Sequence, residues 1–286
     1  MECGAFGPDT AEESGLRYGM SKRFPAVYIP HGGGPWPFVE INFGPKAMWA
    51  PLESYLRSLV SGLSARPRAL LVVSAHWEAP AVTLMSSARP PMLYDYSGFP
   101  PESYRIEWPA PGAPELAGQA RTLLERRGLR TALDAERGFD HGTFVPLKLA
   151  VPNADIPVLQ VSLLQGLDPE QHIAIGQALA PLRAEGVFFI GSGSSYHNMR
   201  GFNQRDALEP SRRFDAWLVE TATLPPLERE AALVRWADAP AARDCHPREE
   251  HLLPLHVMAG AADGDGASFP FQGEMMGVRA SAVQFG

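Results

Sequence analysis

Cysteine is scarce in this 286-residue chain, which has only Cys3 and Cys245. Small secreted domains that depend on disulfides carry several closely spaced cysteines, and that class is excluded here. Cys3 falls in a segment expected to be a tail, so a pairing with Cys245 is not expected. The cysteine content fits a reducing compartment, and we expect a cytoplasmic protein.

Long apolar runs and an excess of basic residues are also absent. No run reaches the roughly 18 apolar residues that a membrane-spanning helix needs. Lysine and arginine total 25 against 32 aspartate and glutamate residues, for a formal net charge of −7. A basic face that binds nucleic acid or anionic membranes is therefore not predicted. The apolar share of 45% is ordinary for a globular protein with a large core.

The N-terminal segment has acidic residues and no apolar stretch of the kind that forms a signal peptide. Met20 is a second plausible start of translation. We expect residues 1–21 to be a flexible extension, and residues 22–286 to form one domain.

The rest of the chain alternates apolar runs with amphipathic stretches, a pattern typical of α/β proteins. We predict a central mostly parallel or mixed sheet with helices on both faces. Strands are expected at residues 26–30, 68–77, 82–85, 130–133 and 156–162, within 185–198, and twice within 269–286. Helices are expected at residues 44–61, 113–127, 169–184, 211–223, 226–237 and 248–260. Residues 89–111 form a long irregular segment rich in aromatic residues, and such loops are usually functional.

Three of the eight histidines follow buried-type strands. His31 follows "AVYIP", His76 follows "LLVVSA", and His197 follows "VFFIGSGSSY". Ligands of open α/β sheets bind at the carboxyl edge of the strands, so a shared site is predicted for these side chains. His141 and His251 lie in short polar breaks and are further candidates.

The other histidines are expected to have no role in the site. His172 lies on the flank of a predicted helix and is expected to be solvated. His246 and His256 are each five residues from His251, whereas residues on one helix face are three or four apart. We interpret both as structural. Cys245 has no CxxC pattern around it, so it is not expected to bind metal.

The glycine row after His31 has two interpretations. An HGGG sequence is the oxyanion-hole element of some esterases, but those enzymes need a G-x-S-x-G nucleophile motif that this chain lacks. "IGSGSS" lacks both the lysine of a P-loop and the third glycine of a dinucleotide fingerprint. The favoured interpretation is that Gly32, Gly33 and Gly34 clear space beside His31 for a metal and a substrate. Imidazole suits Fe(II), zinc and copper.

Several blocks in fixed order resemble one family. They are "PHGGGP", "VVSAHWE", "YDYSGFPPESY", "WPAPG", "GFDHGTFVPL", "PNADIPVLQVSL", "GSGSSYHNMR" and "HPREEHLLPLHVMAGAA". Together they resemble the 4,5-DOPA extradiol dioxygenase family, within the class III extradiol ring-cleaving dioxygenases, from about residue 25 to 286. The first block departs from the usual H-G-S-P of the family, because His31 is followed here by three glycines.

The resemblance implies roles for these residues. His31, His76 and His251 match the metal ligands. His197 matches either a further ligand or the catalytic acid and base, and His141 matches a residue that contacts substrate or transfers a proton. Many relatives use two histidines and a glutamate, so Glu250 is an alternative third ligand. On the predicted helix 248–260, Glu250 and His251 would point about 100° apart and would not share one role.

The resemblance also implies a reaction. The predicted function is a non-heme, metal-dependent extradiol dioxygenase that opens a catecholic ring with O2. Fe2+ is the expected metal, and Zn2+ is the alternative. A zinc-bound relative with hydrolase-like or lyase-like activity, or a metal-binding protein without turnover, remain alternatives. Small catecholic aromatics and O2 are the expected partners, without nucleic acid or membrane, and homo-oligomerisation is left open.

Two further groups of residues are candidates for contact with substrate. Arg105, Arg137 and Arg200 are candidates for binding a substrate carboxylate, although structural or solvated roles are favoured for each. Aromatic residues of the 89–111 segment are candidates for enclosing the ring, and an equally plausible role is packing within the loop: Tyr94, Tyr96, Phe99, Tyr104 and Trp108.

Overall fold

The computed structural model describes residue 1, residues 23–41 and residues 44–286. The predicted extension, residues 1–21, lies outside the described residues except for Met1. None of the helices within the described part of the chain is long and apolar enough to cross a membrane.

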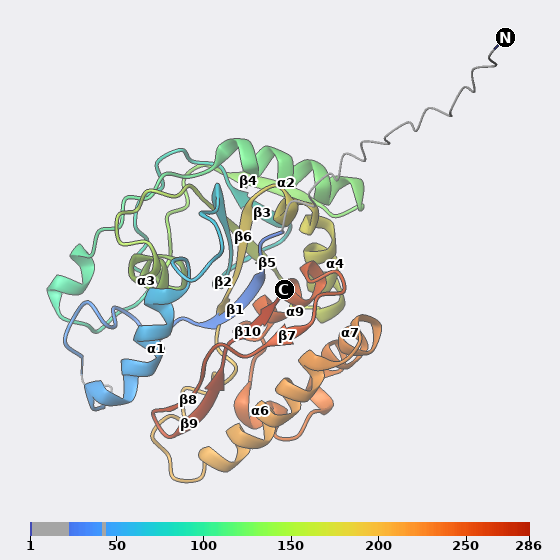
Figure 1. Cartoon of the computed structure of the whole chain (residues 1–286). Coiled ribbons are helices and arrows are strands. Elements are labelled where there is room, and N and C mark those ends of the chain that lie inside the picture. Colours follow the sequence, from blue (N-terminus) through green and yellow to red (C-terminus); the bar gives the residue numbers. More distant parts are fainter. Residues whose placement is uncertain (2–22, 42–43) are drawn as a thin grey trace.

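A mixed sheet forms the centre of the molecule (Figure 1), as predicted. The eight strands of the main sheet follow the order β4-β3-β5-β2-β6-β1-β10-β7. The central strands β5, β2, β6 and β1 are parallel, whereas β3 and β10 pair antiparallel with their inner neighbours. The strands are β1 Ala26–Pro30, β2 Ala69–Ala79, β3 Val82–Met85, β4 Thr131–Asp134, β5 Val158–Leu164, β6 Val187–Gly193, β7 Ala267–Ser268 and β10 Val283–Phe285; β8 Gln272–Met275 and β9 Val278–Ser281 form a separate hairpin.

Helices cover both faces of the sheet, as Figure 1 shows. Alternate residues of β1 enter different cores: Tyr28 packs in the core under α2, α4, α6 and α9, and Ile29 in the core under α1 and α3. This period of two is expected for a strand buried on both faces. The helices are α1 Lys46–Ser58, α2 Pro114–Arg126, α3 His141–Ala150, α4 Pro169–Leu179, α5 Pro181–Ala184, α6 Leu208–Thr223, α7 Pro226–Val234, α8 Ala242–Cys245 and α9 Leu253–Ala261, with 3-10 turns Pro101–Arg105 and Trp236–Asp238.

Prolines set two helix boundaries that were predicted wrongly. The expected helix 169–184 divides into α4 and α5 because Pro181 cannot continue the hydrogen-bond ladder. The expected helix 248–260 begins only at Leu253, with Pro254 in its first turn, the position in a helix where proline is most favourable. Glu250 and His251 therefore lie in a turn before α9, and the argument that a helix holds them apart is wrong.

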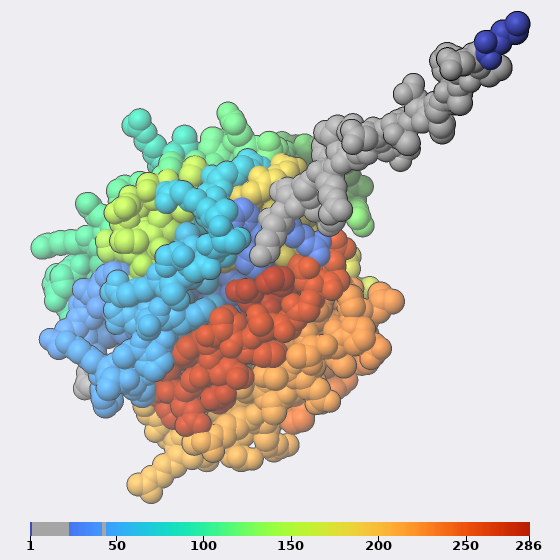
Figure 2. All heavy atoms as spheres, viewed as in Figure 1, coloured from blue at the N-terminus to red at the C-terminus, as the bar shows by residue number. Residues whose placement is uncertain are grey.

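The C-terminal segment makes more strands than predicted. Residues 269–286 contain the hairpin β8–β9 and then β10, which joins the main sheet beside β1. On the face seen in Figure 2, this red segment lies between the light-blue and orange parts of the chain. The hairpin thereby brings C-terminal residues close to the α1 region.

His172 was expected to be solvated, but it is fully buried in α4. Its Nδ1 donates to the Asp168 carbonyl (2.7 Å), and its Nε2 accepts from the Leu164 N–H (3.1 Å). His246 and His256 are also fully buried and hydrogen-bonded to backbone carbonyls, which agrees with structural roles.

These buried histidines predict a loss of stability in acid. Burial lowers the pKa of His246 to about 3, and its Nδ1 has no partner among the described residues. In the unfolded chain this ring is protonated near pH 6.5. The contribution of the neutral His246 ring to the free energy of unfolding is therefore complete above that pH and is lost as the pH falls toward 3. We expect His246 to account for on the order of 3 kcal/mol of this loss. Urea unfolding between pH 7 and pH 4 measures it.

His246→Gln is the matched variant for that measurement. Glutamine keeps a donor for the Ser195 carbonyl, which His246 Nε2 contacts at 3.0 Å, but it does not titrate. The free energy of unfolding of this variant should depend less steeply on pH than that of the wild-type protein. If the free energy of unfolding depended equally on pH in the two proteins, His246 would not be a source of the acid sensitivity.

Candidate functional site

The candidate site is a cavity of about 410 Å³ at the carboxyl ends of the central strands. β1 and β6 are neighbours there, with Pro30 opposite Gly193. His31 directly follows β1, and His197 lies in the loop after β6. All five histidines predicted for the site line this cavity: His31, His76, His141, His197 and His251. The predicted convergence is therefore found.

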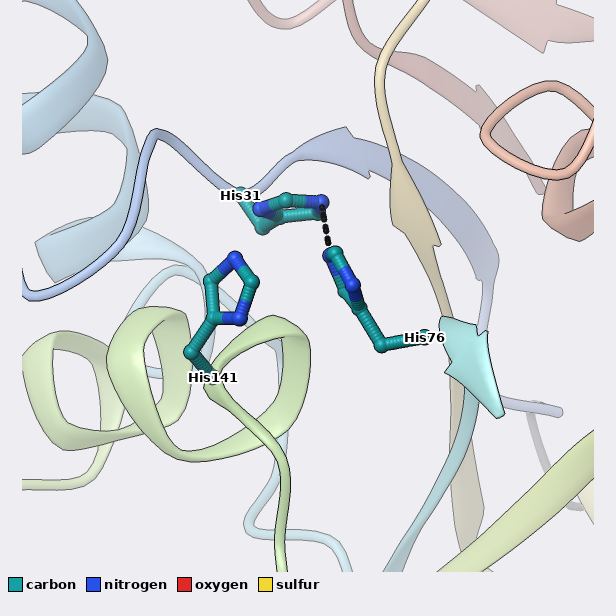
Figure 3. A group of neighbouring side chains, drawn as sticks. All are labelled: His31, His76 and His141. Carbon is teal, nitrogen blue, oxygen red and sulfur yellow. Dashed lines mark hydrogen bonds between the residues drawn. The ribbon is translucent and has the colours of Figure 1, made fainter. Parts of the chain in front are cut away.

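Figure 3 shows three of these rings pointing toward one another from β1, β2 and α3. The Nε2 atoms of His31 and His76 are 3.3 Å apart. His141 lies beside both, with its ring centre 4.0 Å from that of His76 and 5.3 Å from that of His31. One ring nitrogen from each of the three lies within 4.8 Å of the others.

His76 reaches the cavity from inside a strand rather than from beyond its end. β2 continues to Ala79, and its register with β5 shifts between Val73 and Glu78. An irregularity of this kind re-aims side chains locally. The sequence prediction placed His76 correctly at the sheet edge but ended the strand at the wrong residue.

His141 is the first residue of α3, a helix to which the sequence analysis gave no bounds. Asp140 caps this helix, and its carboxylate accepts from the Thr143 N–H (3.2 Å) and the Ser74 hydroxyl (2.7 Å). A Cβ at Gly142 would lie 2.7 Å from Ser74 Oγ and 2.9 Å from His76 Cδ2. The "DHG" sequence thus joins a cap, a site histidine and the glycine that lets them approach β2.

His251 and His197 form the other side of the site. Their rings stack with centres 3.3 Å apart, and the His251 ring lies 5.3 Å from His31 and 4.8 Å from His76. The Tyr28 hydroxyl and the Ser194 N–H both donate to the His251 carbonyl, at 2.8 and 3.1 Å. These bonds fix the turn before α9 against β1 and β6.

Two carboxylates orient four of the rings. Asp95 Oδ1 lies 2.8 Å from Nδ1 of His141, and Asp95 Oδ2 lies 3.4 Å from Nδ1 of His76. Glu250 Oε1 accepts from Nδ1 of both His197 (3.1 Å) and His251 (3.0 Å). A bond at Nδ1 leaves Nε2 available on the other side of each ring.

The surroundings favour the charged form of both carboxylates. Burial raises the pKa of Asp95, but hydrogen bonds from His141 outweigh it and hold that pKa below its usual value. Burial and the hydrogen bond from His197 oppose each other in the same way at Glu250, whose pKa is also lowered. The positive charge of Arg248, 3.4 Å from the Glu250 carboxylate, also lowers this pKa. The same guanidinium binds Glu78 at 2.6 and 2.7 Å. Two negative charges therefore lie directly behind the histidines.

Three of these rings, those of His31, His76 and His251, are held neutral. Burial, and then the neighbouring histidines, lower the pKa of His76 to about 4 and those of His31 and His251 well below the usual value. Neutral imidazole is the form that binds metal. Nε2 of His251 is buried with no hydrogen-bond partner among the described residues. This unpaired nitrogen, on a ring centred 4.8 Å from His76 and 5.3 Å from His31, fits a metal ligand.

The glycine row provides close packing as well as space. Gly32 and Gly34 have φ angles of +86° and +50°, values that residues with a side chain rarely adopt. A Cβ at Gly32 would lie 2.5 Å from the Trp36 ring, and a Cβ at Gly34 would lie 2.7 Å from the Phe99 ring. The row therefore lets two aromatic rings close against the chain beside His31.

Comparison with known proteins identifies the family. Residues 26–280 match the family described as the catalytic LigB subunit of aromatic ring-opening dioxygenase. The chain belongs to the LigB family. A relative from Beta vulgaris, named 4,5-DOPA dioxygenase extradiol, is 43% identical over 74% of this chain and 78% of its own length. A protein of the same name from Escherichia coli is 33% identical over 93% of this chain and 96% of its own length.

A solved structure shares this fold. The crystal structure of an uncharacterized protein from Escherichia coli K12 superimposes with a TM-score of 0.75 at 30% identity, and covers 92% of this chain and 100% of its own. As a member of the LigB family, the chain is a metal-dependent extradiol dioxygenase that opens an aromatic ring with O2. The hydrolase-like, lyase-like and non-catalytic alternatives are not supported.

Sequence reasoning missed several residues of the LigB site. Asp95 was passed over within the aromatic loop, although an acidic residue between two tyrosines was a usable signal. Trp49 of α1, Phe202, and Met275 and Val278 of the hairpin also line the cavity. No local pattern marks these, because they meet only through the tertiary fold.

Proposed function

We propose that His31, His76 and His251 hold Fe(II) in this LigB protein. The observation that supports this set is the His251 ring, whose buried Nε2 has no partner among the described residues and whose centre lies 4.8 Å from that of His76 and 5.3 Å from that of His31. Three neutral imidazoles on one side leave coordination positions open for substrate. When bound, iron would supply those open positions and the one-electron chemistry toward O2 that zinc lacks.

Glu250 acts in this proposal as a positioning residue rather than a ligand. Its Oε1 is engaged by Nδ1 of both His197 and His251, and Glu250 is not among the cavity-lining residues. In the same way, the Asp95 carboxylate lies against Nδ1 of His141 and of His76. Carboxylates that bind the distal nitrogen of ligating histidines fix the ring orientation and raise ligand basicity.

Proton transfer falls to His197 first and His141 second. His197 is the more accessible ring, with a side chain 23% exposed against 9% for His141. Each has Nδ1 held by a carboxylate, so Nε2 is the atom that takes a proton from a catechol hydroxyl and later returns it. Tyr96 and Phe99 line the same cavity and would exclude water from the ring.

Oxygen uptake by metal-loaded protein tests the proposal. Protein loaded anaerobically with Fe(II) should consume O2 with catechols and yield a coloured ring-opened product. Protein loaded with zinc to the same stoichiometry is the control and should consume none. Equal rates for the two metals, or no uptake by the iron form with any catechol, would overturn the iron assignment.

Replacing Glu250 with glutamine should weaken metal binding or turnover by about 10- to 100-fold. The neutral amide oxygen is a weaker acceptor than the carboxylate for the Nδ1–H groups of His197 and His251. Glu249→Gln is the matched control, because Glu249 pairs with Arg243 away from the cavity. Competition with a chelator and steady-state kinetics measure both effects. If Glu250→Gln removed the metal completely, Glu250 would instead be a ligand.

A further inference from the structure

We propose that the preferred substrates are catechols with an uncharged, apolar substituent on the ring. This inference rests on the proposed function and names the substrate class of the same site.

The part of the lining that is not histidine is largely apolar. Phe202, Met275 and Val278 contribute from the loop after β6 and from the β8–β9 hairpin. Trp49 and Phe99 contribute from α1 and the aromatic loop. A surface of this kind gains free energy when it covers an apolar substituent. Methionine side chains adapt to irregular shapes, so bulky substituents can be accommodated.

Met199 extends this apolar surface to the solvent-facing side of the cavity. It lines the cavity and is nevertheless 71% exposed, one of the few large apolar residues so exposed in the described part of the chain. An exposed apolar side chain beside a binding cavity is suited to an apolar ligand that covers it. A substituent pointing away from the histidines would meet Met199.

The fixed charges around the histidines provide no partner for a charged substituent. The carboxylates of Asp95 and Glu250 lie behind the histidines, and their side chains are only 17% and 13% exposed. Bound Fe(II) would bring two positive charges, which the Asp95 and Glu250 carboxylates offset. A charged substituent of either sign would therefore find no net opposite charge beside the histidines.

The arginines considered for a substrate carboxylate are placed elsewhere. Arg137 binds Asp140 at 3.0 Å and the His76 carbonyl at 3.2 Å, and it stacks over Trp77. Arg105 and Arg200 are exposed, and none of the three lines the cavity. Within the described residues, the cavity lining contains no lysine or arginine. A carboxylate placed there would be desolvated without a cationic partner.

Three probes of similar size test the proposal: 4-propylcatechol, 3-(3,4-dihydroxyphenyl)propanoate and 3,4-dihydroxyphenethylamine. The neutral probe should have a kcat/KM at least about tenfold above both charged probes. An equal or higher value for either charged probe would overturn the inference. Anaerobic calorimetry with the metal-loaded protein ranks the same three by Kd. If no probe were turned over, the proposed function would fail, while the binding order would still decide the substrate class.

Met199→Arg provides the matched change in charge. Because Met199 is largely exposed, arginine should be tolerated by the fold, which circular dichroism and the melting temperature would check. The ratio of kcat/KM for the propanoate to that for 4-propylcatechol should rise about tenfold. Met199→Leu should leave that ratio unchanged. An equal ratio in the arginine and leucine variants would contradict the placement of the substituent beside Met199.

Discussion

Replacing His76 with alanine is expected to remove the bound metal and the ring-opening activity together. His76 Nε2 lies 3.3 Å from Nε2 of His31, and its ring centre lies 4.8 Å from that of His251. Loss of a carboxylate that only orients a ligand costs 10- to 100-fold, so loss of a ligand itself should cost more. We expect turnover to fall roughly a thousandfold or more. Metal analysis after gel filtration and O2 uptake measure the two losses.

Ser97→Ala is the control for that experiment. Ser97 lines the same cavity but offers neither imidazole nor carboxylate, so the variant should keep its full metal content. A melting temperature and a circular dichroism spectrum would separate loss of metal from loss of fold in His76→Ala. If folded His76→Ala bound iron at wild-type stoichiometry, the proposed ligand set would be wrong.

The strand ends that carry the site were predictable because burial leaves a strong local signal. "AVYIP" is a continuous apolar run that ends in His31, and the structure places β1 at those residues. The parallel order of β1, β6 and β2 then brings His31, His197 and His76 to one edge of the sheet. Two-sided burial and the convergence of parallel strand ends are general rules, so they need no tertiary information.

Features that depend on distant packing were not predictable. The irregularity in β2 near His76 depends on how the strand meets β5. The burial of His172 depends on which face of α4 meets the sheet and α9. Asp95 reaches His141 across 46 residues of sequence separation, by a loop path that no local pattern specifies. The placement of Glu250 failed for a simpler reason, since a helix start was assigned upstream of Pro254.

Replacing His197 with alanine should separate proton transfer from metal binding. We expect the variant to retain its iron and to bind catechol, while kcat falls about 100- to 10,000-fold with little change in KM. The reason is that His197 Nε2 is proposed to accept the catechol proton, whereas the metal is held by other rings. His141→Ala should have a smaller effect on kcat if the order of the two residues is correct.

The stacking of His197 on His251 requires a second variant. The two ring centres are 3.3 Å apart, so alanine also removes support from a proposed ligand. His197→Phe keeps an aromatic ring at that position but can neither accept a proton nor bind metal. Retention of iron by the phenylalanine variant, together with lost turnover, would support the proton-transfer role. Loss of iron from both folded variants to the extent seen for His76→Ala would make His197 a ligand and would transfer the acid and base role to His141.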